Sequence, residues 1–120
     1  MGKIESFEDL KVWQKSHELV LEIYKMIKTL PKEEKFGLIS QMTRAAVSVS
    51  ANIAEGFKRR SIKDKINFYN TSQSSLSELQ YYLILVKDLK YSGKIEKANL
   101  LIEEVGKMLN GLITSIKCDP

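Results

Sequence analysis

Hydrophobic residues recur every three or four positions through long stretches of this chain, and the residues that end helices stand between those stretches. The clearest stretch contains Ile95, Ala98, Ile102, Val105, Leu109, Leu112 and Ile116. This spacing places one side of an α-helix against a core. Both prolines, Pro31 and Pro120, and most glycines fall where the pattern predicts helix ends. No strand pattern competes, so we expect an all-α fold.

The periodicity predicts four helices, over about 7–29, 36–57, 62–89 and 93–117. Short connections favour antiparallel neighbours, which gives an up-down-up-down antiparallel four-helix bundle. A chain of 120 residues with 43% hydrophobic residues fits a single domain over 1–120. Serine followed three residues later by aspartate predicts helix starts at Ser6 and Ser61.

The first predicted helix is apolar over an arc of about 220°, which is wider than one stripe of a monomeric bundle requires. The residues on this arc are Leu10, Val12, Trp13, Leu19, Val20, Leu21, Ile23, Tyr24, Met26, Ile27 and Leu30. We expect the surplus to contact a second copy in a homo-oligomer. The alternative is that neighbouring helices or the chain ends cover it.

The second predicted helix is dominated by small residues, which permit close approach of its backbone to other helices. Its polar residues Arg44, Asn52 and Glu55 recur at helical spacings. They could satisfy one another or meet partners across an interface, and we favour a structural role over a chemical one.

Catalysis and metal binding find little support. His17 is the only histidine and Cys118 the only cysteine, so neither a catalytic triad nor a structural zinc site can be assembled in the usual way. His17 falls on the seam of Leu10, Trp13, Val20 and Tyr24, where a core or interface histidine with one satisfied nitrogen is expected. We expect no enzyme, no metal and no cofactor.

The formal net charge of +4 is concentrated in one octet, residues 58–65, which has five basic side chains and one acidic one. Of the 19 basic and 15 acidic residues, 14 of each therefore lie elsewhere. The five cations are Lys58, Arg59, Arg60, Lys63 and Lys65. Cations at a helix N-terminus oppose the helix dipole, whereas a bound phosphate reverses that effect. The octet is thus a candidate nucleic-acid site; the alternative is a solvated turn.

A second basic zone is expected at the opposite end of the bundle, where acidic residues are interleaved with it. Its lysines are Lys25, Lys28, Lys32, Lys35, Lys87, Lys90, Lys94 and Lys97. The lone cysteine suits a reducing compartment, and neither a signal peptide nor a stretch long enough to span a membrane is evident. We expect a cytoplasmic protein without a membrane partner.

Six phrases of the sequence resemble a known family. They are the stretches 7–13, 36–38, 44–49, 51–56, 59–61 and 75–79. In this order they resemble the bacterial four-helix bundle proteins encoded by intervening sequences of 23S ribosomal RNA genes. Asn-Ile-Ala-Glu-Gly at 52–56 is the most specific phrase. The same fold is seen in the accessory variability determinant of diversity-generating retroelements, a basic pentamer that works with a reverse transcriptase and RNA.

The resemblance implies a ring-like homo-oligomer, with the pentamer as the expected form, and a nucleic-acid-related role without catalysis. The partners it implies are RNA or DNA, a reverse transcriptase or a ribosomal component. A protein interaction scaffold that docks a partner on the first or second helix is the alternative. The family often has proline where this chain has Ser50, so the second helix is expected to run straighter here. The net charge is also lower than expected of the retroelement protein.

Overall fold

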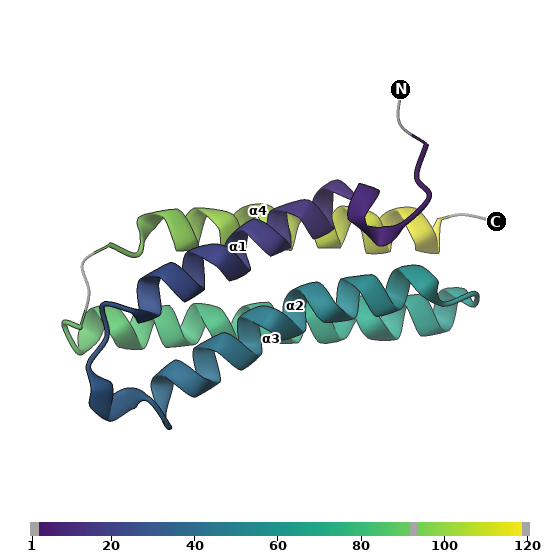
Figure 1. Ribbon diagram of the computed structural model, residues 1–120. Helices are drawn as coiled ribbons and strands as arrows, with labels where there is room; N and C mark the ends of the chain where they lie inside the picture. The colour runs from purple at the N-terminus through teal and green to yellow at the C-terminus, as the bar shows by residue number, and fades with distance from the viewer. Residues whose placement is uncertain (1–2, 92–93, 119–120) are drawn as a thin grey trace.

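Four long helices lie side by side in the computed structural model, which describes residues 3–91 and 94–118 (Figure 1). They are α1 (Lys11–Ile27), α2 (Leu38–Lys58), α3 (Ile62–Asp88) and α4 (Glu96–Lys117), with short 3₁₀ turns η1 (Phe7–Asp9) and η2 (Lys32–Glu34). The described ranges contain no strand, so the all-α prediction is confirmed. None of their helices is long and apolar enough to cross a membrane.

One hydrophobic cluster joins buried residues from all four helices. The predicted seam of α4 is confirmed: five of its residues are buried, and Leu112 and Ile116 are half-buried against the cluster. On α1, the wide apolar face is largely covered, because only Leu21 (58% exposed) and Tyr24 (46% exposed) remain prominent. The first helix therefore does leave apolar side chains exposed, but fewer than the width of its apolar arc predicted.

The first helix begins at Lys11 rather than Phe7, because the chain is extended at Leu10 (φ −75°, ψ 126°). Before that break, the Asp9 carboxylate accepts hydrogen bonds from the backbone N–H groups of Glu5 (2.9 Å) and Ser6 (3.1 Å). These bonds hold η1 as a separate turn. They also lower the pKa of Asp9 below its usual value, the bond from Glu5 contributing most.

The second and fourth helices also start later than predicted. The Glu34 side chain accepts a hydrogen bond from the N–H of Leu38 (3.2 Å), which fixes the start of α2 two residues after Phe36. The predicted start at Gly93 lies outside the described residues, and α4 begins at Glu96. At the end of α3, Lys90 adopts a left-handed conformation (φ 60°), and the N–H of Tyr91 donates to the carbonyl of Val86 (3.0 Å).

Small side chains bring α2 close to its neighbours. The Ser72 hydroxyl donates to the carbonyl of Val49 (2.8 Å), and the hydroxyls of Ser48 and Ser75 lie 2.7 Å apart. Ser16 of α1 contacts Ser50 in the same way at 2.8 Å. The helix is continuous through Ser50. Short hydroxyl contacts thus replace bulky side chains between these helices.

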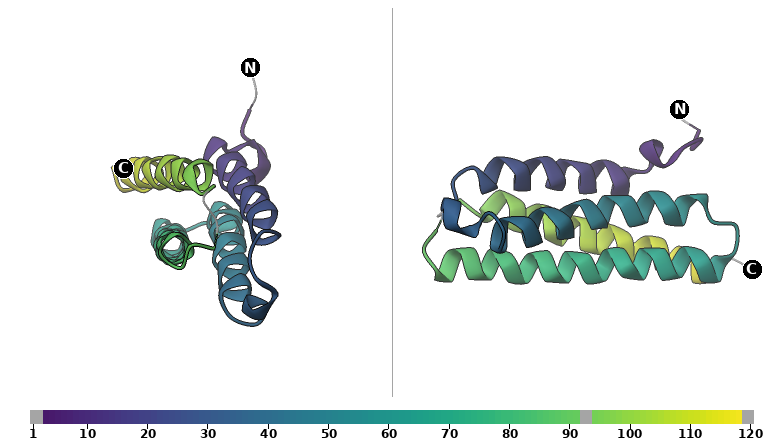
Figure 2. Two further views of the ribbon diagram at one scale, coloured as in Figure 1. Left: turned by 90° about the vertical axis from the view of Figure 1, so that its left-hand side faces the viewer. Right: turned by 60° about the horizontal axis from the view of Figure 1, so that its bottom comes forward.

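The turn between α2 and α3 lies at the same end of the molecule as η1 and the last turn of α4 (Figures 1 and 2). The connection from α3 to α4 lies at the other end. This arrangement brings Phe7 of η1 beside Lys58 of the basic octet.

Candidate nucleic-acid interface

The basic octet occupies a tight turn whose geometry is set by both flanking helices. Arg59 is extended (φ −72°, ψ 151°), and its N–H donates to the carbonyl of Gly56 (3.2 Å) at the end of α2. Ser61 then caps α3 by accepting a hydrogen bond from the N–H of Asp64 (3.1 Å), as its sequence predicted. The octet is thereby held at the end of the bundle.

Lys65 is bound within the turn. Its ammonium donates to the carbonyls of Phe57 (2.8 Å) and Gly56 (3.2 Å), and the side chain is half-buried. These carbonyls belong to the last turn of α2, where a cation offsets the negative end of the helix dipole. The structure therefore gives Lys65 a stabilising role that its place in the sequence did not indicate.

Arg59 is also engaged. Its guanidinium lies 2.9 Å from a carboxylate oxygen of Glu55 and 4.7 Å from the ring centroid of Phe68. Both charged side chains of the pair are substantially exposed, so the pair adds little stability. Glu55 nevertheless compensates one of the five positive charges.

Arg60 and Lys63 are exposed, and neither has a hydrogen-bond or ion-pair partner among the residues that the structure describes. Lys58 is exposed as well, and its ammonium lies 5.7 Å from the ring centroid of Phe7. The five predicted site residues thus separate into two groups. Arg60, Lys63 and Lys58 have no hydrogen-bond or ion-pair partner among the described residues, whereas Arg59 binds a carboxylate and Lys65 binds two backbone carbonyls.

An aromatic cluster adjoins these cations. The Trp13 and His17 rings are stacked, with centroids 5.1 Å apart and an interplanar angle of 5°. Phe7 meets Trp13 edge to face at 5.1 Å, and it is the same Phe7 that lies beneath Lys58. The cluster therefore connects the first turn of α1 to the last turn of α2.

The sequence interpretation of His17 as a core residue is wrong, because the side chain is exposed. The core-facing side of α1 runs through Val12, Leu19 and Ile23, and His17 lies beyond the edge of that stripe. Its spacing of four from Trp13 could have predicted the stacked pair, since residues at this spacing are neighbours on a helix. Whether His17 contacts another chain stays a prediction.

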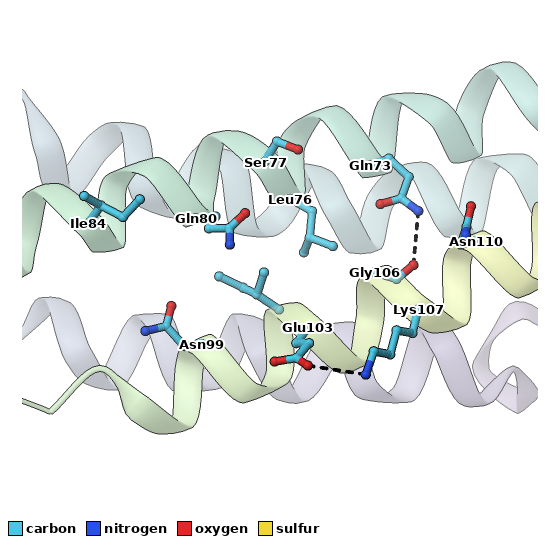
Figure 3. A pocket seen from close by; sticks show the side chains of 11 residues that line it. Gln73, Leu76, Ser77, Gln80, Ile84, Asn99, Glu103, Gly106, Lys107 and Asn110 are labelled. Carbon is cyan, nitrogen blue, oxygen red and sulfur yellow. Dashed lines mark hydrogen bonds and ion pairs between the residues drawn. The ribbon is translucent and has the colours of Figure 1, made fainter.

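A groove of about 660 Å³ separates α3 from α4 (Figure 3). Amide side chains face it from both helices, including Gln80 and Asn99. Gln73 closes one side by donating to the carbonyl of Gly106 (3.2 Å). The described residues contain no group of three or more His, Cys, Asp or Glu that could hold a metal ion.

The opposite end of the bundle is more evenly charged than the octet. Glu34 accepts a hydrogen bond from the Tyr91 hydroxyl (2.9 Å), and Glu22 lies 3.7 Å from the Lys97 ammonium. The hydrogen bond with Glu34 raises the pKa of Tyr91. Acidic side chains thus take part in the contacts of this end, in agreement with the acidic residues that are interleaved with its lysines in the sequence.

The model of the 23S rRNA-intervening sequence protein family matches residues 8–111. The chain belongs to this family. The match includes the Asn-Ile-Ala-Glu-Gly phrase, the basic octet and the stacked pair of Trp13 and His17. The match begins at residue 8 and therefore does not include Phe7, the aromatic residue that lies beneath Lys58.

A solved structure resembles this intervening-sequence family protein closely. It is a protein with unknown function from the S23 ribosomal protein family of Bacteroides thetaiotaomicron VPI-5482, with 31% sequence identity and a TM-score of 0.79. The similarity covers 86% of this chain and 95% of the other. No curated protein matches this member of the family.

Proposed function

We propose that this protein is a non-enzymatic RNA-binding accessory protein whose basic turn between α2 and α3 holds nucleic-acid phosphates. One observation carries the proposal: Arg60 and Lys63 are exposed at one end of the molecule with no carboxylate or other partner among the described residues. Arginine and lysine donors are the side chains that bind phosphate best, and Lys58 adds a third. Membership in the 23S rRNA-intervening sequence protein family supports the same choice of ligand.

The structure refines which residues of the octet are expected to contact RNA. Arg60, Lys63 and Lys58 form the phosphate-binding set, which we call the basic rim. Arg59 joins it only if it leaves Glu55. Lys65 acts through the turn that it stabilises, because its ammonium is bound to two carbonyls of α2. Binding through such a rim is expected to depend strongly on salt and weakly on base sequence.

The proposal is tested by measuring the affinity of the protein for a fluorescently labelled, structured RNA at two salt concentrations. Arg60→Glu combined with Lys63→Glu is expected to weaken binding by at least tenfold at low salt. The matched control is Lys32→Glu combined with Lys87→Glu, which makes the same change in net charge at the opposite end. Equal losses in both variants, or no loss in the first, would contradict a role for the rim.

A ring-like homo-oligomer, an up-down-up-down helix order and a cytoplasmic location complete the proposal. Self-association is supported by Leu21 and Tyr24 of α1 together with Val47 of α2, which is 43% exposed beside Tyr24. Tyr24 and Val47 line the same shallow pocket, and Leu21 precedes Tyr24 by three residues on one face of α1; we call these three residues the apolar patch. A pentamer would repeat the basic rim around one axis. A reverse transcriptase or a ribosomal component is the proposed further partner.

Light scattering of the purified protein separates self-association from the alternative, a scaffold for a foreign protein. A single species several times the 13.7 kDa mass of the chain, converted to monomers by Tyr24→Glu with Val47→Glu, is expected. A monomeric wild-type protein would contradict the ring. It would favour the scaffold, since the apolar patch would then be free to bind another protein.

A further inference from the structure

The stacked pair of Trp13 and His17 forms a flat aromatic surface at the edge of the basic rim. Their rings are almost parallel, with an interplanar angle of 5°. Trp13 is half-buried and is held from the side by Phe7, whereas His17 is exposed. One face of the imidazole is covered by Trp13, and the described residues give His17 no second ring contact.

Positive charge lies next to this surface. Lys58 contacts Phe7 (5.7 Å from its ammonium to the ring centroid), and Phe7 contacts Trp13. Two nearby carboxylates are already engaged, since Asp9 binds backbone N–H groups and Glu55 binds Arg59. An exposed aromatic face beside cations is the combination that binds single-stranded nucleic acid, where bases stack and phosphates meet basic residues.

From this geometry we infer that His17 stacks an unpaired base of single-stranded RNA, with Trp13 supporting the imidazole from behind and Lys58 contacting the adjoining phosphate. The inference rests on the proposed function, and it names the ligand as a single-stranded segment. A continuous duplex keeps both faces of its bases covered by neighbouring bases, so it can bind the basic rim but cannot use His17 in this way.

The chain provides its own reporter, because Trp13 is its only tryptophan. The full-length protein is titrated with a single-stranded oligoadenylate RNA and with an RNA duplex that has the same number of phosphates. Tryptophan emission and the anisotropy of labelled RNA are followed together. The oligoadenylate is expected to change Trp13 emission with the same midpoint as the anisotropy, and the duplex is expected to leave emission nearly unchanged.

His17→Ala is expected to weaken oligoadenylate binding about tenfold, which corresponds to the loss of one stacked base, and to leave duplex binding unchanged. His17→Phe is expected to restore the affinity, because it restores a flat ring. Tyr81→Ala is the control, since Tyr81 is an exposed aromatic residue on α3 whose ring contact is with Tyr82 and not with Trp13 or Phe7. Circular dichroism establishes that each variant is folded.

The outcomes separate this inference from the proposed function. If His17→Ala binds oligoadenylate as the wild type does, while Arg60→Glu with Lys63→Glu still lowers the affinity, the stacking role is overturned and the basic rim stands. Equal losses of duplex and oligoadenylate affinity in His17→Ala would also overturn it. If the wild type binds neither RNA, the proposed function fails and the stacking role fails with it.

Discussion

Gly56 of α2 packs directly against the ring of Tyr69 in α3. A Cβ atom built on Gly56 would lie 2.5 Å from Cε1 and 2.8 Å from Cδ1 of that ring. Tyr69 is buried, at 2% exposure, so its ring has little room to move away. This contact sets the spacing of α2 and α3 just before the basic turn.

Gly56→Ala is therefore expected to destabilise the protein by about 1–3 kcal/mol, the usual range for an overpacked core. Gly111→Ala is the matched control, because a Cβ at Gly111 meets nothing within 4 Å. That substitution in an exposed helical position is expected to stabilise by about 0.5–1 kcal/mol. Urea denaturation measures both changes, and equal stability of Gly56→Ala and the wild type would contradict the packing argument.

Lys65 and Lys63 lie two residues apart but are expected to have different roles. Replacing Lys65 should mainly lower the stability of the fold, and replacing Lys63 should mainly lower the affinity for RNA. Lys65→Met removes two hydrogen bonds to the carbonyls of α2 and is expected to cost about 1 kcal/mol of stability. Lys63→Met is expected to change stability by less than about 0.5 kcal/mol, because it removes an exposed side chain without a partner in the described structure. Thermal unfolding compares the variants, and RNA affinity should show the larger loss in Lys63→Met.

The N-terminal turn is expected to loosen in acid. The pKa of Asp9 is lowered by hydrogen bonds from the N–H groups of Glu5 and Ser6. The carboxylate therefore stabilises η1 fully above its unfolded pKa, and this stabilisation is lost as the pH falls through the lower folded pKa. Trp13 emission should report the change, because Phe7 of η1 contacts Trp13.

In the wild type the emission should shift as the pH falls below about 4, the ordinary pKa of an aspartate. Asp9→Asn should reduce this pH dependence, since an amide accepts the same two hydrogen bonds without titrating. Glu8→Gln is the control on the same turn and should keep the wild-type profile. An unchanged profile in Asp9→Asn would exclude Asp9 as the group responsible.

The sequence predicted the elements of this fold well because helical periodicity reports directly on burial. The α4 seam and the Ser61 cap were both readable in this way. The break at Leu10 was not, because it depends on which backbone groups the Asp9 carboxylate binds. A serine three residues before an aspartate is compatible with either a 3₁₀ turn or a full helix.

The sequence predicted where the basic residues cluster, but it did not predict which of them bind other groups of the protein and which remain free to contact a ligand. Five cations in one octet look alike in the sequence, yet Lys65 turns back to α2 and Arg59 pairs with Glu55. Those contacts depend on the path of the chain between two helices. The proximity of Phe7 to Lys58 also required the tertiary structure, because 51 positions separate the two residues along the chain.

The central claim is that Arg60 and Lys63 contact RNA phosphates, and the salt dependence of binding tests it most directly. The slope of log affinity against log salt concentration counts the phosphates neutralised, at roughly 0.7 for each contact with a single strand. Replacing Arg60 and Lys63 together with Met should therefore reduce the slope for oligoadenylate by roughly 1.4 relative to the wild type. A slope unchanged by the double substitution would contradict the account.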